Sequence, residues 1–550
     1  MILKNTTDRY YLLFLLVVFT ILLLGLGSYG LAETSEARYA EISREMFVYG
    51  DYLNPELLGI FHFHKPPVVY YITSLGYQIF GINEFGARFF LQVAVVIQLM
   101  LVYRITDTLY KDKKLAFMAG LIYFSMPIVL ISSRNLTTDA FVTTFIISSI
   151  YCWQVYATKN KTLFLYLFYG LVGIALLTKG PVALLFVAVY IICSKIVLKK
   201  GWKINVHHII GFLLCIAIGA SWYVMVMIEN PKLWDYFVEK QLLSRVNSDS
   251  FNRSKPFWFY LPIVLGLLLP YWIALLPKLK SNFKSLLNKK PETKILFYSS
   301  IILIGLFSIF STKLIMYILP IFWMPSIVIA VEIKKAKQKT RDLINIVYAI
   351  LLGLLLLGIY LCWFLEIIHI NISYKVLSII TGVSMVFFII FQLIERENTF
   401  KPAILAGSFG AAIIIISTTV MAHNSSLTNS TRDMVHFIDG ISKDQDKTIL
   451  VYNYLLTSIP FYTDDIEITV DSGHDTTRRE IQFENDETWE EHLWDIKKES
   501  TISRLSSLSR KRNTYLLIRN KSEKDPQIIP IENNFNSHKS YPKWTLYYNK

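Results

Sequence analysis

Residues 33–67, ETSEARYAEISREMFVYGDYLNPELLGIFHFHKPP, follow directly on an apolar run at residues 10–31 and are the most informative stretch of this 550-residue chain. The stretch combines carboxylates, cations and a His62-x-His64 pair beside a predicted membrane segment. Ionisable groups at a membrane boundary are costly unless they face water or one another, so they indicate binding or chemistry. The alternative is a solvated loop. Its charged residues are Glu33, Glu36, Arg38, Glu41, Arg44, Glu45, Asp51, Glu56 and Lys65.

Long apolar runs recur from Tyr10 to Ala422, and 53% of all residues are hydrophobic. A helix that crosses a hydrocarbon core of ~30 Å needs about 20 such residues, and a backbone in lipid must form its hydrogen bonds internally. The pattern therefore predicts a polytopic α-helical membrane protein with thirteen spans. The predicted spans are 10–31, 87–109, 115–133, 140–157, 163–178, 181–198, 208–228, 257–277, 295–310, 314–332, 343–365, 376–394 and 402–422.

Lysine and arginine recur in every second loop between these spans. Cytoplasmic loops of membrane proteins carry such an excess, so the pattern predicts a cytoplasmic N-terminus. The net charge of +14 is then mainly a topology signal, and no nucleic-acid partner is expected. The first apolar run is longer than the apolar region of a usual signal peptide, which favours an uncleaved anchor. With an odd number of spans, the C-terminal region lies on the outer face.

The composition becomes polar after residue 422, with short β-rich runs such as TILVYNYLL and IEITV. We predict a transmembrane domain at 1–422, with amphipathic helices in a first outer loop at 32–86. Residues 423–550 are predicted to form a small outer-face α/β domain. All four cysteines lie inside predicted spans, so no disulfide is expected.

Several cations lie on the predicted outer side, against the positive-inside bias. Some occupy very short connections, such as Lys179 in TKGP and Lys313 in STKLIMYILP. Taken singly, each is an anchor for lipid headgroups. Taken with the acidic first loop, they indicate an outer cavity for a ligand that carries phosphate. These cations are Arg38, Arg44, Lys65, Arg88, Arg134, Lys179, Lys232, Lys240, Arg245, Arg253, Lys255, Lys313 and Lys375.

The motifs SEARYAEISREM, GDYLNPELLG and FHKPPVVYYITSLGYQIFGINEFGAR together resemble the first outer loop of GT-C glycosyltransferases. The resemblance is strongest to the lipid A aminoarabinose transferases and their relatives among protein mannosyltransferase-like enzymes. Further matches are RNLTTDAF, TKGP, WDYFVEK, KPFWFYLP and KLIMYILP, and the similarity extends to about residue 330. The first-loop motif is long and specific, whereas TKGP alone is weak.

The resemblance implies that a sugar moves from a polyprenyl-phosphate carrier, such as undecaprenyl phosphate, to an acceptor with inversion at the anomeric carbon. The implied acceptor is lipid A, another lipopolysaccharide or a protein, at the outer face of a cell inner membrane. Such a reaction needs a carboxylate that takes the acceptor's proton and cations that stabilise the departing lipid phosphate. No cofactor is required, and the sequence contains no Gly-rich phosphate loop.

Matched position by position, residues from several loops correspond to the family's site. Asp139 matches a second carboxylate beside that site, and the alternative is a helix N-cap, because TTDAF opens a span. The resemblance assigns the donor phosphate to Arg38, Lys65, Arg245 and Lys313, and the donor pocket to Tyr39 and Tyr317.

The sequence departs from the family at the expected base, because Ser35 replaces the first residue of an Asp-Glu pair. A serine cannot act as that base at neutral pH. The expected base is therefore Glu36, with Glu33 next and Asp139 as a third candidate.

A second departure concerns metal binding. His64 replaces a glutamate that can bind zinc in some relatives, and Lys240 replaces its partner histidine. An ammonium group has no lone pair for a metal, so His62 and His64 remain weak ligand candidates. No divalent metal is expected to be required.

Two other functional classes remain open at this point. One is a transporter or flippase of lipid-linked sugars, although the span interiors between residues 140 and 228 are nearly free of charge. The other is a non-catalytic relative that binds a polyprenyl phosphate.

Overall fold

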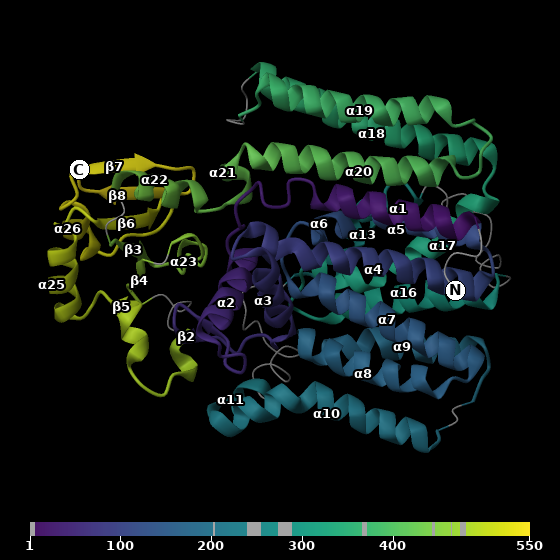
Figure 1. The fold of residues 1–550 in the computed structure, drawn as a ribbon, viewed down its shortest axis with the longest axis horizontal. Coiled ribbons are helices and arrows are strands. Elements are labelled where there is room, and N and C mark those ends of the chain that lie inside the picture. Colours follow the sequence, from purple (N-terminus) through teal and green to yellow (C-terminus); the bar gives the residue numbers. More distant parts are fainter. Residues whose placement is uncertain are drawn as a thin grey trace. The chain divides into compact units, whose positions relative to one another are not determined.

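The computed structural model describes residues 6–201, 204–238, 255–272, 289–365, 371–442, 446–463, 465–473 and 480–550 (Figure 1). The chain forms two compact units. The helical unit comprises residues up to Leu26 together with Arg88–His423. The loop–sheet unit comprises Gly27–Ala87, which we call the loop segment, together with Asn424–Lys550.

Within the described residues, nine helices are long and apolar enough to cross a membrane. They are α1 (Thr6–Leu23), α4 (Glu84–Tyr110), α7 (Thr138–Lys159), α8 (Thr162–Lys179), α10 (Val206–Glu229), α16 (Pro291–Ile309), α18 (Gln338–Leu365), α19 (Tyr374–Leu393) and α20 (Lys401–Ala422). The other elements of this unit in the described ranges are shorter: α5 (Lys113–Phe124), α6 (Pro127–Ser132), α9 (Val182–Val197), α11 (Lys232–Asp235), η2 (Phe257–Phe259), α13 (Tyr260–Leu267), η3 (Ile315–Ile321) and α17 (Trp323–Lys335).

Over the described residues, each of the thirteen predicted spans contains helical residues, but nine helices alone are long enough to cross a membrane, and the spans at 115–133 and 314–332 divide into two helices each. The span predicted at 115–133 divides into α5 and α6, where Pro127 starts the second helix. The span at 314–332 divides into η3 and α17, which are bent by 58° close to Pro320. Proline lacks an amide donor and its ring clashes with the preceding turn, which explains both breaks. The span at 257–277 is seen only in part, because residues from 273 lie outside the described ranges.

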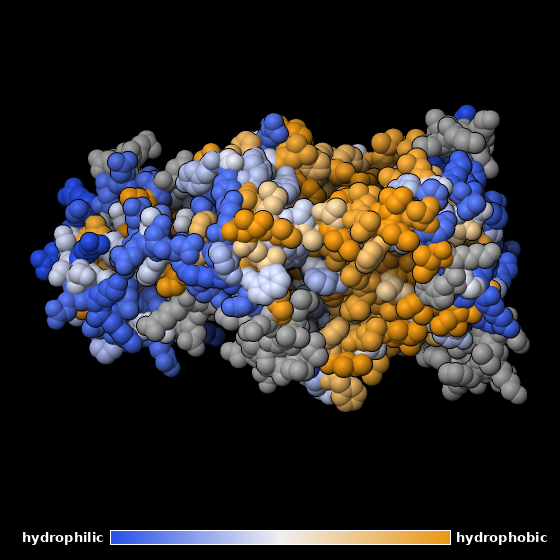
Figure 2. All heavy atoms as spheres, turned by 90° about the horizontal axis from the view of Figure 1, so that it is seen from below, coloured by the Kyte–Doolittle hydropathy of each residue, from blue (hydrophilic) through white to orange (hydrophobic). Residues whose placement is uncertain are grey.

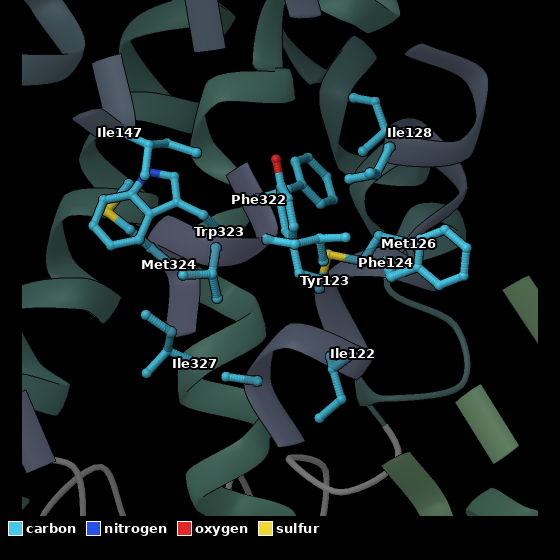
Figure 3. Packing of buried hydrophobic residues seen from close by; sticks show 14 of the residues in the cluster. Ile122, Tyr123, Phe124, Met126, Ile128, Ile147, Phe322, Trp323, Met324 and Ile327 are labelled. Atoms are coloured by element: carbon cyan, nitrogen blue, oxygen red, sulfur yellow. The ribbon is translucent and has the colours of Figure 1, made fainter. Parts of the chain in front are cut away.

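Both breaks lie in the hydrophobic core of the helical unit. Figure 3 shows Tyr123 beside the first break and Trp323 beside the second, and both side chains are fully buried. The Tyr123 hydroxyl donates a 2.7 Å hydrogen bond to Gln98 Oε1, so this buried polar group is satisfied.

The outside of the helical unit is unusually apolar. Figure 2 shows hydrophobic side chains covering much of the visible helical surface. Leu213 on α10, Leu354 on α18 and Val386 on α19 are each more than half exposed. A monomeric soluble protein rarely exposes so large an apolar surface, whereas lipid accommodates it. The chain is a multi-span membrane protein.

The loop–sheet unit contains a mixed six-stranded sheet in the order β5-β4-β3-β6-β8-β7. Strands β3 (Thr448–Tyr452), β4 (Ile466–Asp471), β5 (Leu493–Asp495) and β6 (Thr514–Arg519) pair in parallel. Strands β7 (Ser537–Ser540) and β8 (Trp544–Tyr548) extend the sheet in antiparallel fashion. The helical elements beside the sheet are α21 (Ser425–Thr428), α22 (Arg432–Ser442), α23 (Ile459–Tyr462), η4 (Glu480–Phe483), η5 (Thr488–Glu491), α25 (Glu499–Leu508) and α26 (Ile528–Glu532).

Alternating residues of the central strand β3 point into two separate cores. Ile449 and Val451 belong to one core, and Leu450 and Tyr452 belong to the other. This period of two is typical of a strand that is covered on both faces. The predicted α/β character of the C-terminal region is confirmed, and the runs TILVYNYLL and IEITV contain strands β3 and β4.

The loop segment contains α2 (Ser35–Tyr49), a hairpin of β1 (Glu56–Leu57) and β2 (Ile60–Phe61), and α3 (Val68–Phe80). The residues of the loop segment pack with the C-terminal residues as one compact unit, and side chains of the loop segment accept hydrogen bonds from the C-terminal segment. The domain division at residue 422, with the loop at 32–86 in the transmembrane domain, stays a prediction.

Candidate functional site

The start of α2 places Ser35 and Glu36, the two positions that match the family's Asp-Glu pair. Ser35 opens the helix and is exposed, whereas Glu36 is only 1% exposed. The Glu36 carboxylate accepts a 2.8 Å hydrogen bond from the Ala32 amide, four residues earlier. This bond ties the chain just before α2 to the helix, and a carboxylate in the first turn complements the helix dipole. Glu36 therefore has a local structural partner as well as its candidate role as base.

Glu33 lies just before α2 and is bound by the C-terminal segment. Its carboxylate accepts hydrogen bonds from the Ser458 amide at 2.7 Å and the Thr457 hydroxyl at 3.3 Å. Burial raises the pKa of Glu33, and these bonds together with nearby Arg38 offset part of that rise. Both carboxylate oxygens of this candidate base are thus engaged by the protein.

Arg38 and Tyr39 follow on the next turn of α2, and both are partly buried. The Arg38 Nε atom is buried without a hydrogen-bond partner. A buried guanidinium donor without a partner is costly, and a bound anion would satisfy it. The Tyr39 ring lies 5.8 Å from the ring of Tyr70.

Other acidic residues of the loop segment have structural partners. Glu41 receives a bidentate pair of hydrogen bonds from Arg44 at 2.9 and 2.7 Å. Glu45 accepts the amides of Leu58 and Gly59, which fastens the β1–β2 hairpin to α2. Burial, followed by the nearby Glu41 carboxylate, raises the pKa of Glu45 well above its usual value.

His62, His64 and Lys65 come from the hairpin and the turn after it. His62 is 2% exposed, and its ring packs edge-on against His64 at 4.5 Å. The His64 ring also lies 5.5 Å from the Phe483 ring. Over the described residues, no group of three or more potential ligands could hold a metal ion. The expectation that the protein requires no metal stays a prediction.

The helical unit holds a second group of candidate residues. Asp139 lies in the first turn of α7 and forms an ion pair with Lys179, the last residue of α8. Lys179 Nζ also lies 4.6 Å from the ring centroid of Tyr317 in η3. The structure thus brings together a carboxylate, a cation and a phenol whose positions in the sequence are far apart.

The site-residue prediction did not include Lys179, although TKGP was singled out as a motif. The signal that marks it is an outer-side cation in a very short connection. Gly180, with φ +80°, ends α8 directly after Lys179. A residue with a Cβ is strained in this conformation, so the glycine sets where the lysine is presented.

Lys313 is 2% exposed and donates a 2.8 Å hydrogen bond from Nζ to the Lys255 carbonyl. Burial lowers its pKa. The carbonyl of the next residue, Leu314, accepts a 3.0 Å hydrogen bond from the Tyr260 hydroxyl, which orders the connection around Lys313. In the turn before α7, Asn135 Oδ1 and Thr137 Oγ1 are buried without partners.

The predicted site residues therefore fall into two groups. One group lies in the loop–sheet unit: Glu33, Glu36, Arg38, Tyr39 and Lys65. The other lies in the helical unit: Asp139, Lys313 and Tyr317. The predicted phosphate ligand Arg245 and the departure at Lys240 lie outside the described residues.

Comparison with known proteins supports the resemblance. A family model described as dolichyl-phosphate-mannose-protein mannosyltransferase matches residues 64–224. An undecaprenyl phosphate-alpha-4-amino-4-deoxy-L-arabinose arabinosyl transferase of Proteus mirabilis is 32% identical over 312 residues, which are 56% of this chain and 56% of the relative. A second such transferase of that organism is 28% identical over 408 residues, covering 73% of this chain and 70% of the relative. In the first alignment, the chain thus spans just over half the length of its relative.

Among solved structures, the crystal structure of ArnT from Cupriavidus metallidurans bound to undecaprenyl phosphate has a TM-score of 0.77 at 19% identity. The match covers 99% of both chains. The predicted fold, a polytopic helical protein with a small α/β C-terminal part, is confirmed. The predicted resemblance to GT-C transferases of the aminoarabinose and protein mannosyltransferase type is confirmed as well.

Proposed function

We propose that this chain is an inverting glycosyltransferase that uses an undecaprenyl-phosphate-linked sugar, with 4-amino-4-deoxy-L-arabinose as the first donor to test. The names of its relatives, and the undecaprenyl phosphate bound to the similar ArnT protein, support this donor class. Lipid A or another envelope glycolipid is the proposed acceptor, and a protein acceptor is the alternative. We place the enzyme in the cell inner membrane, with the loop–sheet unit on the outer face.

The observation that carries the proposal is the contact of Asp139 with Lys179 and of Lys179 with Tyr317. Inverting transfer needs a base for the acceptor hydroxyl and a cation for the leaving phosphate, and this group contains both. Lys313, which is held by a backbone carbonyl, supplies a second ammonium in the same unit.

In the proposed reaction, a carboxylate removes the proton from the acceptor hydroxyl as its oxygen attacks the anomeric carbon. The bond from that carbon to the phosphate oxygen breaks, and undecaprenyl phosphate leaves with the bonding electrons. Before the donor binds, Lys179 neutralises Asp139. A donor phosphate competes for Lys179, which leaves Asp139 available as the base. Glu36 is the second candidate, whereas Glu33 has both carboxylate oxygens occupied.

The test incubates the purified protein in nanodiscs with a panel of undecaprenyl-phosphate sugars, with and without lipid A or protein acceptors. The expected result is release of free undecaprenyl phosphate only when an acceptor is present, together with a glycosylated acceptor seen by mass spectrometry. Movement of the intact carrier across the bilayer without loss of its sugar would contradict transfer and indicate a flippase.

Single substitutions then identify the base. Asp139→Asn is expected to abolish transfer while leaving donor binding measurable, and Glu36→Gln tests the second candidate. If Asp139→Asn keeps most of the activity and Glu36→Gln loses it, Glu36 is the base and Asp139 serves to hold Lys179.

A further inference from the structure

Two side chains of the C-terminal segment hold both ends of the loop segment. The Tyr462 hydroxyl accepts the Leu31 amide at 2.8 Å and donates to Glu84 Oε1 at 3.1 Å. Arg432 contacts the same Glu84 oxygen at 3.2 Å through Nη1, and its Nη2 donates to the Ser28 carbonyl at 3.1 Å. The beginning and the end of the loop segment therefore meet at Arg432 and Tyr462.

The backbone near the first end also approaches the C-terminal segment very closely. A Cβ atom built on Gly30 would lie 2.2 Å from Ser430 Oγ and 3.1 Å from the Tyr462 hydroxyl. Only glycine fits at such a distance. The Glu33 amide donates to the Asn429 carbonyl at 3.1 Å, which continues the contact towards α2.

The middle of the loop segment has its own attachment. Glu484 accepts the Phe61 amide at 2.6 Å, four residues before Lys65. The segment that carries the candidate residues Glu36, Arg38 and Lys65 is thus fixed at both ends and near its middle.

We propose that Arg432 and Tyr462 are positioning residues for the transfer reaction, because they hold the loop segment in the geometry that its donor-binding and base candidates require. The inference rests on the proposed function, since positioning matters only if Glu36, Arg38 or Lys65 contacts the substrates. Neither residue needs to contact a substrate itself.

Their contacts can be removed without dismantling the sheet. Arg432 is the first residue of α22, and its side chain is 21% exposed. The side chain belongs to neither of the two sheet cores. In Tyr462→Phe the ring that packs against Phe461 at 5.2 Å remains, and only the hydroxyl is lost. Small displacements of reacting groups cost much rate, about 100-fold for 1 Å. We expect Arg432→Gln and Tyr462→Phe each to lower kcat roughly 10-fold with KM changed less than twofold.

The experiment compares these variants with Arg432→Lys and with Lys447→Gln as a matched control. Lysine can still pair with Glu84 but cannot also reach Ser28, so Arg432→Lys should recover part of the lost kcat. Lys447 pairs with Asp439 and Asp465 at 2.8 and 2.7 Å inside the same domain and touches no loop residue in these pairs. The control should therefore leave kcat unchanged even if it lowers the melting temperature.

Hydrogen–deuterium exchange of loop-segment peptides in the full-length protein supplies the second readout. Arg432→Gln and Tyr462→Phe should raise exchange in residues 28–50, and Lys447→Gln should not. Unchanged loop exchange, or kcat that falls only in proportion to the melting temperature, would overturn the inference. If the unmodified protein transfers no sugar, the proposed function fails, and the exchange data still decide whether these two residues hold the loop.

Discussion

The close approach at Gly30 leads to a quantitative test of how the loop segment is held. In Gly30→Ala, the new Cβ would lie 2.2 Å from Ser430 Oγ and 2.8 Å from Ser430 Cβ. The hydroxyl can rotate away, but the Cβ cannot, so the two backbones must separate by about 0.6 Å to reach ordinary contact. Overpacking of this kind costs about 1–3 kcal/mol of stability.

The same displacement should affect the proposed reaction. A shift of about 0.6 Å in the backbone that leads into α2 is expected to lower kcat roughly 10-fold. Gly440→Ala is the matched control, because a Cβ at Gly440 in α22 meets nothing within 4 Å. Replacing an unobstructed helical glycine should raise stability by about 0.4–1 kcal/mol and leave kcat unchanged.

A second substitution provides the rescue. Ser430→Gly removes the two closest of the three atoms that the new Cβ would meet and leaves only the Tyr462 hydroxyl at 3.1 Å. The loss of the Ser430 bond to the Arg432 amide should cost only a few tenths of a kcal/mol. The double variant should therefore recover most of the loss in thermal unfolding, loop exchange and transfer, because only the 3.1 Å contact with the Tyr462 hydroxyl remains. Wild-type stability and exchange in Gly30→Ala, or no recovery in the double variant, would refute the close approach.

Three further predictions follow from buried charges. Lys179→Met should destabilise the protein by about 3–5 kcal/mol, because it leaves Asp139 without its partner. The double variant with Asp139→Asn should regain thermal stability but not transfer activity. If the double variant does not regain stability, the pairing is contradicted. Glu33→Gln should retain activity within about tenfold, because the amide oxygen still accepts the Ser458 amide; abolished transfer with unchanged loop exchange would instead make Glu33 the base. Burial, and then the nearby Glu33 and Glu41, raise the pKa of Glu467 well above its usual value. The unfolded chain therefore loses this proton more readily than the folded protein. Wild-type stability should fall as the pH rises above the pKa of the unfolded chain, which is near 4.5. Glu467→Gln should remove that contribution, and its melting temperature should exceed that of the wild type by a margin that grows with pH; a margin independent of pH would contradict this.

The membrane fold was predictable because its cause is local. Each span needs an apolar run of sufficient length, and the breaks at Pro127 and near Pro320 follow from the covalent structure of proline. Position-by-position matching also marked Asp139 and Tyr317, which the structure joins through Lys179. Lys179 itself was visible only as one of many outer-side cations, and its ion pair was not predictable because its partner lies 40 residues earlier on another helix.

The roles of the loop carboxylates were not predictable from their local pattern. Glu33, Glu36 and Glu45 look alike in sequence, yet one binds the C-terminal segment, one binds the amide four residues earlier and one holds a hairpin. These differences arise from which amide each carboxylate meets after folding. A single sequence does not reveal such partners, because polar contacts leave no periodic pattern.

The sequence by itself determined a many-span helical membrane protein with an α/β C-terminal part, because hydrophobic length and strand alternation are properties of short segments. Only the tertiary structure decided that residues 27–87 pack with residues 424–550. Leu31 and Tyr462 are separated by 431 positions, and Glu33 and Ser458 by 425. Their bonds form because buried polar groups require partners, and folding alone determines which partners come within reach.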